Sequence, residues 1–236
     1  MPIDDFLFKI YGMYTYLLIN IFSISIPLIA SFDKRLNLHK QWKYLFPGMF
    51  ITHAFFVAWD VLYTYWGIWG FNPKYLTGIN LINLPIEEWM FFISIPYACV
   101  FTYYSLNYLF KKDYLGKYAN GISLVLAAIL ITVAVFNYSK LYTSVTFGLT
   151  AIFLLLHVYV FKSKYLGRFY FSYLFILIPF FIVNGLLTGS FIAEEVVWYD
   201  DSQNLGIRIF TIPVEDSVYG LLLILMNVSF FEWFKE

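Results

Sequence analysis

Seven long apolar stretches constrain this 236-residue chain more than any other feature of its sequence. They run approximately over residues 7–31, 43–66, 88–110, 119–138, 141–161, 169–193 and 216–234. A helix needs about 20 apolar residues to cross a hydrocarbon layer of roughly 30 Å, whereas a barrel strand needs about 9–11 residues of alternating polarity. Backbone groups in lipid must be paired within the protein, so runs of this length predict helices and no strand. The sequence therefore predicts an all-α, polytopic membrane protein with seven transmembrane helices.

The composition excludes several other classes of protein. The chain is 61% hydrophobic and 13% charged, against about 45–50% and about 25% for soluble domains. The 15 basic residues cancel the 15 acidic ones, so the chain has no net field that would attract nucleic acid. A single cysteine, Cys99, excludes an internal disulfide, and the three histidines lack metal-ligand spacing. We therefore expect a lipid bilayer as partner, no nucleic acid and no metal site.

The basic residues are distributed unevenly between the two sides of the predicted bundle. One side holds Lys34, Arg35, Lys40, Lys43, Lys111, Lys112, Lys117, Lys162, Lys164, Arg168 and Lys235, and the other holds Lys9, Lys74, Lys140 and Arg208. Short cytoplasmic loops carry an excess of Lys and Arg. This split predicts that the N-terminus is outside and the C-terminus is in the cytoplasm. It also places the two longest connections, 67–87 and 194–215, outside.

Two sequence patterns occur once in each half of the chain. The first copy comprises Asp60-x-x-x-Thr64 and Pro85-Ile86-Glu87-Glu88, and the second comprises Asn184-x-x-x-Thr188 and Pro213-Val214-Glu215-Asp216. Three helices, one linking helix and three more helices would give both copies the same orientation in the membrane. We therefore predict parallel three-helix repeats, helices 1–3 within residues 1–112 and helices 5–7 within 141–236. Helix 4, within 113–140, joins them, and a shared site is expected between the repeats.

Five acidic residues are the candidate catalytic groups. An ionisable side chain costs about 2.5 kcal/mol or more at the centre of a bilayer, so it needs an explanation. One acid after a helix-starting proline is explained by the helix dipole, but adjacent acids in both halves exceed that need. Asp60 shares a helical face with Thr64 and His53, and an interhelical clamp there would contribute only about 0.6 kcal/mol. The candidates are Glu87, Glu88, Glu215, Asp216 and Asp60.

Aromatic residues crowd the same part of the sequence. Many aromatic side chains in membrane proteins form interfacial belts, but here they surround the predicted carboxyl groups. A cation desolvated against aromatic faces gains roughly 2 kcal/mol or more, so this environment suits a carbocation made from an oily polyene. The candidate substrate-binding residues are Trp59, Trp66, Trp69, Phe71, Trp89, Thr64, Asn184 and Thr188.

These motifs resemble those of the membrane-integral lycopene cyclases. The stretches that carry the resemblance are Trp59-Asp60 through Thr64, Gly67-Ile68-Trp69, Phe71-Asn72-Pro73, Leu84 to Phe92, Asn184 to Gly189, Val197-Trp198-Tyr199, Leu205 to Ile209 and Ile212 to Asp216. The chain looks like a fused form of the heterodimeric bacterial lycopene β-cyclase. The resemblance implies an intramolecular lyase or isomerase of the bacterial inner membrane, which turns the open ends of lycopene and related carotenes into β-ionone rings. It leaves open whether the chain forms a homo-oligomer.

The residues agree with this chemistry. A neutral carboxylic acid would protonate the terminal double bond, the neighbouring double bond would close the ring, and a carboxylate would accept the released proton. No electrons are exchanged, and no dinucleotide-binding motif follows a predicted strand, so we expect no cofactor. We expect Glu87 and Glu215 to be the leading acid and base, supported by Glu88, Asp216 and Asp60. Which carboxyl is the acid stays open.

Two alternatives are disfavoured and one stays open. A retinal protein needs a lysine within the last helix, and residues 216–234 contain none. A membrane prenyltransferase needs paired Asp-rich sites for magnesium diphosphate, and Asp200-Asp201 lacks a second cluster. A carrier for a proton or small solute remains the alternative, because parallel repeats with acids near the midplane would serve it.

Overall fold

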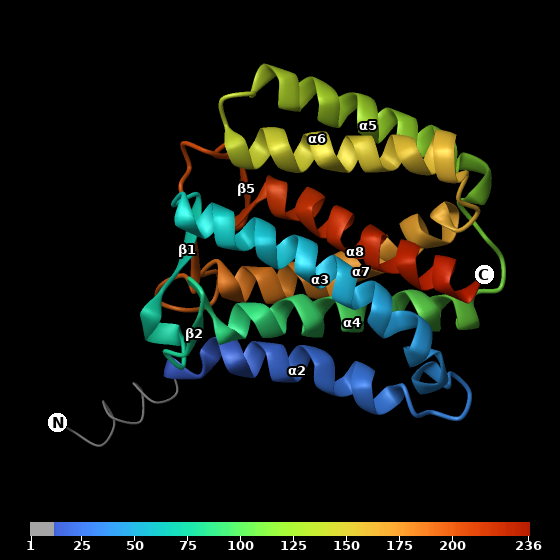
Figure 1. Ribbon diagram of the computed structural model, residues 1–236, viewed down its shortest axis with the longest axis horizontal. Helices are drawn as coiled ribbons and strands as arrows, with labels where there is room; N and C mark the ends of the chain where they lie inside the picture. Colours follow the sequence, from blue (N-terminus) through green and yellow to red (C-terminus); the bar gives the residue numbers. More distant parts are fainter. Residues whose placement is uncertain (1–11) are drawn as a thin grey trace.

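The computed structural model describes residues 12–236 and is an all-α bundle, as predicted. Within these residues the seven α-helices are α2 (Thr15–Ala30), α3 (Trp42–Tyr65), α4 (Ile86–Leu109), α5 (Ala119–Phe136), α6 (Leu141–Leu156), α7 (Leu166–Leu187) and α8 (Val214–Lys235) (Figure 1). Six helical segments of the described chain are long and apolar enough to cross a membrane, and α2 is a shorter apolar helix. The predicted first helix begins at residue 7, outside the described residues.

Two helix ends differ from their predictions. The predicted helix 169–193 ends at Leu187, because Gly189 adopts a left-handed conformation (φ 94°) and the Ser190 N–H bonds back to the Gly185 carbonyl. This is the usual way in which a glycine stops a helix. The predicted helix 141–161 is α-helical only to Leu156 and continues as a π-helical turn, His157–Phe161. Hydrophobicity alone did not reveal either change.

The expectation of no strand was wrong, because the two long connections contain short antiparallel pairs. β1 (Trp69–Phe71) pairs with β4 (Val197–Tyr199), β2 (Asn80–Leu81) with β3 (Leu84–Pro85), and β5 (Arg208–Ile209) with β6 (Ile212–Pro213). Strands of two or three residues are too short to show an alternating pattern. Short 3₁₀ turns occur at η1 (Leu38–Gln41), η2 (Pro73–Tyr75) and η3 (Gly116–Tyr118).

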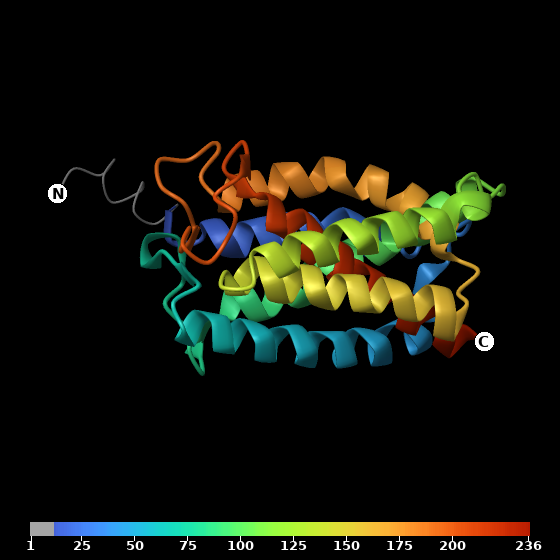
Figure 2. The same ribbon diagram turned by 90° about the horizontal axis from the view of Figure 1, so that it is seen from above.

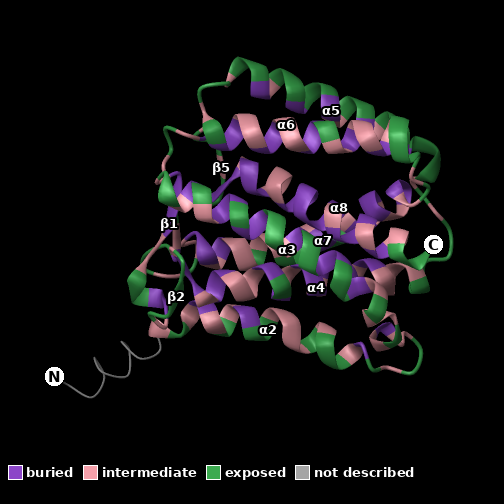
Figure 3. Cartoon of the chain, viewed as in Figure 1, coloured by how far each residue is buried: buried purple, intermediate pink, exposed green. Residues whose placement is uncertain are grey.

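The helices lie side by side, and α4 and α8 occupy the middle of the bundle (Figures 1 and 2). α2 packs on α4, α6 packs on α8, α3 packs on α8, and α4 packs on α7. α8 is mostly buried, whereas α5 packs chiefly on α6 and exposes its outer face (Figure 3). Phe22, Phe50 and Ile178 are among the apolar side chains exposed on the outside of the bundle, as a helix surface facing lipid requires.

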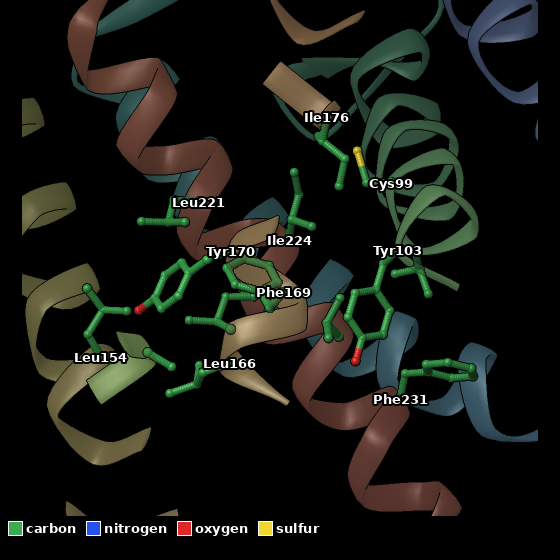
Figure 4. Close-up of a cluster of buried hydrophobic side chains, with 14 of the residues drawn as sticks. Cys99, Tyr103, Leu154, Leu166, Phe169, Tyr170, Ile176, Leu221, Ile224 and Phe231 are labelled. Carbon is green, nitrogen blue, oxygen red and sulfur yellow. The ribbon is translucent and has the colours of Figure 1, made fainter. Parts of the chain in front are cut away.

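A large apolar cluster holds α4, α7 and α8 together. Tyr103 of α4, Phe169 and Ile176 of α7, and Ile224 and Phe231 of α8 belong to it, and Figure 4 shows their side chains between these helices. The two long connections lie at one end of the bundle and the C-terminus lies at the other (Figure 1). The fold therefore collects both motif-bearing loops at a single end.

Candidate active site

The two carboxyl pairs occupy equivalent positions at the loop end of the bundle. Each pair lies in the first turn of a central helix, directly after a proline that ends a two-stranded hairpin. The proline favours the first turn of a helix, and the free backbone N–H groups there favour nearby acids. All four carboxyl side chains, Glu87 and Glu88 on α4 and Glu215 and Asp216 on α8, are buried.

The first acid of each pair binds the backbone of its own loop. Glu87 Oε1 accepts a hydrogen bond of 2.7 Å from the Thr77 N–H. Glu215 Oε1 accepts one of 2.8 Å from the Leu205 N–H and one of 2.6 Å from the Thr143 hydroxyl. These carboxyls therefore fix the loops against the helix ends.

The second acid of each pair is held by tyrosines and lines a cavity. The Tyr16 hydroxyl of α2 donates to Glu88 Oε2. The Tyr142 hydroxyl of α6 donates to Asp216 Oδ1 at 2.5 Å, and Asp216 Oδ2 accepts from the Tyr199 hydroxyl at 2.9 Å. The same Oδ2 lies 3.2 Å from the donating Asn184 side-chain amide, the position that matches Asp60 in the sequence pattern.

Asp60 on α3 is the third carboxyl of this cavity. Its Oδ1 accepts a hydrogen bond from the indole N–H of Trp69 on β1. Its Oδ2 is buried and finds no partner among the described residues. A charged carboxylate with one oxygen that accepts no hydrogen bond is poorly stabilised in apolar surroundings. The position therefore favours the neutral acid.

The cavity has a volume of about 180 Å³ and is lined mainly by apolar side chains of α4, α7 and α8. Asp60, Glu88 and Asp216 lie at its loop end, with the Tyr219 ring of α8 in the same wall. Ligand pockets for whole drug-sized molecules measure about 300–1,000 Å³. This cavity is therefore suited to one end of a long apolar molecule. Among residues 12–236, no three His, Cys, Asp or Glu side chains are placed to hold a metal ion.

The structure brings six of the thirteen predicted site residues to the cavity and leaves seven outside it. Those that line the cavity are Asp60, Glu88, Asp216, Trp69, Phe71 and Asn184. Those outside its lining are Glu87, Glu215, Trp59, Thr64, Trp66, Trp89 and Thr188. Trp66 is 55% exposed on the bundle surface. The Trp89 indole donates to the Leu81 carbonyl at 3.3 Å, and the Thr188 hydroxyl bonds to Thr211.

Four cavity tyrosines were missing from the sequence prediction. Tyr16 and Tyr142 are each the second residue of a helix, α2 and α6, and each donates to an acid of a different helix. This matched position was the signal that could have revealed them. Tyr199 and Tyr219 complete the set. Burial, followed by the nearby Asp216 carboxyl, raises the pKa of Tyr199 in β4 well above its usual value, so its hydroxyl stays a donor.

Comparison with known protein families identifies the chain. The model of the lycopene cyclase family matches residues 13–106 and 137–234. The chain belongs to the lycopene cyclase family. This confirms the resemblance seen in the sequence, and it makes the chain a membrane lycopene cyclase of carotenoid biosynthesis, with carotenes as the substrates that the family implies. Searches of curated proteins and of solved structures found no match.

Both matched segments of the cyclase end in a carboxyl-bearing helix. The first runs to the last turn of α4 and the second to the last turn of α8, and the unmatched residues between them include the whole of α5. The family match thus covers every helix that contributes to the cavity.

Proposed function

We propose that this cyclase is a lycopene β-cyclase, which converts the open ψ ends of lycopene to β-ionone rings by acid–base catalysis without net redox change. The single observation that carries the proposal is the cavity, in which three buried carboxyls and a set of aromatic rings meet at the end of an apolar channel. Carboxyls in apolar surroundings are how proteins hold both a proton donor and a proton acceptor at neutral pH.

We assign the proton donor to the pair formed by Asp60 and Glu88. Asp60 has one oxygen without a partner among the described residues, and Glu88 accepts a hydrogen bond only from Tyr16 among the described side chains. A neutral acid here would add its proton to the terminal double bond and leave a tertiary cation. The adjacent double bond then attacks this cation and closes a six-membered ring.

We assign the proton acceptor to Asp216. Its two oxygens accept hydrogen bonds from Tyr142, Tyr199 and Asn184, and donors of this number favour an ionised carboxylate. The carboxylate would remove a ring proton from the second cation and form the ring double bond. One proton enters and one leaves, so the reaction is an isomerisation and needs no electron carrier. The faces of Trp69 and Tyr219 would stabilise the cations on the way.

Glu87 and Glu215, the leading pair expected from the sequence, take a positioning role in this proposal. Their bonds to the loop backbone, at 2.7 Å and 2.8 Å, keep the hairpins and helix starts in place. The acids next to them then project into the cavity.

The arrangement in the membrane is part of the same proposal. Each helix packing in one half has an equivalent in the other. The packing of α2 on α4 corresponds to that of α6 on α8, and the packing of α3 on α8 corresponds to that of α7 on α4. Matched loop bonds, such as Asn72 N–H to Val196 O and Asp200 N–H to Ile68 O, support two repeats of the same orientation. The basic residues support a C-terminus in the cytoplasm, and the resemblance to the bacterial cyclases implies that the membrane is the inner membrane of a bacterium.

Expression in a lycopene-accumulating host, followed by pigment analysis, tests the proposal. We expect products with β-ionone rings, and purified protein in liposomes should form them without added flavin or nicotinamide. An inactive but folded protein that moves protons or solutes across the liposome membrane would refute the proposal and favour the carrier alternative. A strict need for reduced flavin would refute the redox-neutral chemistry.

A further inference from the structure

The two halves of the cyclase have equivalent carboxyl sites but unequal space beside them. Counterpart positions follow from the motifs: Glu88 corresponds to Asp216, Asp60 to Asn184, and Tyr16 to Tyr142. Both members of each pair line the cavity, so its loop end lies between the two halves. Beyond this end the cavity continues on one side only, between α2, α4 and α7 and against Gly220, Leu223 and Ile224 of α8.

Residue size explains this asymmetry. At four positions the residue that lines the open side is smaller than the residue at its counterpart position. The pairs, with the open-side residue first, are Ser23 and Leu149, Ala98 and Met226, Val183 and Trp59, and Gly220 and Phe92, of which Phe92 also borders the cavity. A Cβ at Gly220 would already lie 3.3 Å from the Phe180 ring, so glycine leaves the room that a phenylalanine would take.

The corresponding space on the other side is filled by packed aromatic rings. The centroid of the Trp59 ring lies 5.8 Å from that of Phe56, 5.6 Å from that of Tyr63 and 5.2 Å from that of Tyr219. These residues belong to one buried cluster together with Phe92. Closely packed interiors leave no void of ligand size, so a second polyene has no channel there.

The lining of the open side extends to the lipid-facing surface of the bundle where α2 and α7 meet. Ser23 of α2 and Pro179 of α7 both line the cavity, and Pro179 is also exposed on the outside of the bundle. On α4 the lining extends from Glu88 to Thr102, which is about 21 Å at 1.5 Å per residue. The three carboxyls, Asp60, Glu88 and Asp216, all lie at the loop end of the cavity. Only the chain end that enters first can therefore meet them.

We infer that the cyclase has one substrate channel, entered from the bilayer between α2 and α7, and closes one ring per binding event. This inference rests on the proposed function and adds to it the order in which the two ends of lycopene are cyclised. A long polyene between packed helices has no space to turn end for end. The one-ring product must leave into the bilayer before its open end can be presented to the carboxyls.

An isotope-dilution experiment tests the order. The cyclase in liposomes receives ¹³C-labelled lycopene together with a tenfold excess of the unlabelled one-ring carotene. We expect ¹³C to appear first in the one-ring product, and the early two-ring product to be mostly unlabelled. A ¹³C one-ring product that never gains a second ring supports the inference equally. Immediate ¹³C two-ring product, unaffected by the unlabelled pool, would overturn it. If no ring forms at all, the proposed function fails as well.

Matched substitutions test which side holds the channel. Ala98→Met gives the open side the residue of its counterpart position, and we expect ring formation to fall at least tenfold. Met226→Ala is the reciprocal change on the filled side, where we expect less than a twofold loss. Thermal unfolding of both variants in detergent shows whether they remain folded, and the stoichiometry of lycopene binding should be one per chain for wild type and for Met226→Ala. Two lycopene molecules per wild-type chain, or an equal loss of ring formation in two folded variants, would overturn the assignment.

Discussion

Replacing Glu88 by Gln tests whether Glu88, and not its neighbour Glu87, transfers the proton. The change keeps the size of the side chain and an oxygen that can accept the Tyr16 hydroxyl, but it removes proton transfer. General acid–base groups contribute about 10²–10⁴-fold to rate, which corresponds to about 2.7–5.4 kcal/mol of activation free energy at 1.36 kcal/mol per factor of ten. We therefore expect Glu88→Gln to lower the rate of ring formation at least 100-fold.

Glu87→Gln is the matched variant at the neighbouring position. Its Oε1 atom accepts the Thr77 N–H at 2.7 Å and faces the loop. A glutamine oxygen can still accept this bond and loses only the charge assistance, which is worth about 1 kcal/mol. Even if this whole loss were added to the activation free energy through a displaced Glu88, the rate would fall by less than about tenfold. The two variants are thus expected to differ by at least a factor of ten.

The assay uses purified protein in liposomes with lycopene, and the initial rate of ring formation is followed by chromatography of the pigments. Thermal unfolding of each variant reports whether it is folded. If both variants are folded and Glu87→Gln falls as far as Glu88→Gln, the assignment to the cavity-facing acids is refuted. The original expectation that Glu87 leads the chemistry would then hold.

Three further predictions follow from the fold and the proposed reaction. In heavy water, each closed ring should gain one deuterium on the ring carbon next to the dimethyl-bearing carbon, and unlabelled product during turnover would exclude a solvent-exchanging acid. Single cysteines at Thr77 and Lys164 in a Cys99→Ala background should react with impermeant thiol reagents from opposite sides of the membrane; reaction from one side would contradict the topology. Gly48→Ala should destabilise the bundle by about 1–3 kcal/mol, because its Cβ would come within 2.5 Å of a side chain on α8. Gly121→Ala on α5, where a Cβ meets nothing within 4 Å, should not destabilise it, and equal loss of thermal stability in both would contradict the packing.

Much of the fold could be predicted from the sequence because helix formation in a bilayer is a local matter. The length of an apolar run decides whether it can span the membrane, and backbone pairing in lipid forces it to be helical. The predicted spans 43–66 and 88–110 therefore begin and end within two residues of α3 (Trp42–Tyr65) and α4 (Ile86–Leu109). The duplicated Pro-x-Glu-acid pattern marked the right helix starts for the same local reason.

The direction of each acid, by contrast, was decided by tertiary structure. Neighbouring helical residues point about 100° apart, so Glu87 meets the loop backbone while Glu88 meets Tyr16, 72 residues away in the sequence. Only the packing of α2 on α4 settles which of the two faces the cavity. Sequence pattern alone named both acids as candidates and favoured Glu87, whereas it is Glu88 that lines the cavity.

The aromatic residues show the same division between local and tertiary information. Their abundance around Asp60 was evident from the sequence and predicted a site in this region, where the structure has a cavity. Trp69 reaches the cavity because β1 pairs with β4 of the other half, whereas Trp59 is packed into the filled side with Phe56 and Tyr219. The sequence by itself determined a membrane bundle with two acidic motifs, because these depend on runs and neighbours along the chain. The tertiary structure alone decided which acids share a cavity and which side of it is open, because both depend on contacts between residues far apart in sequence.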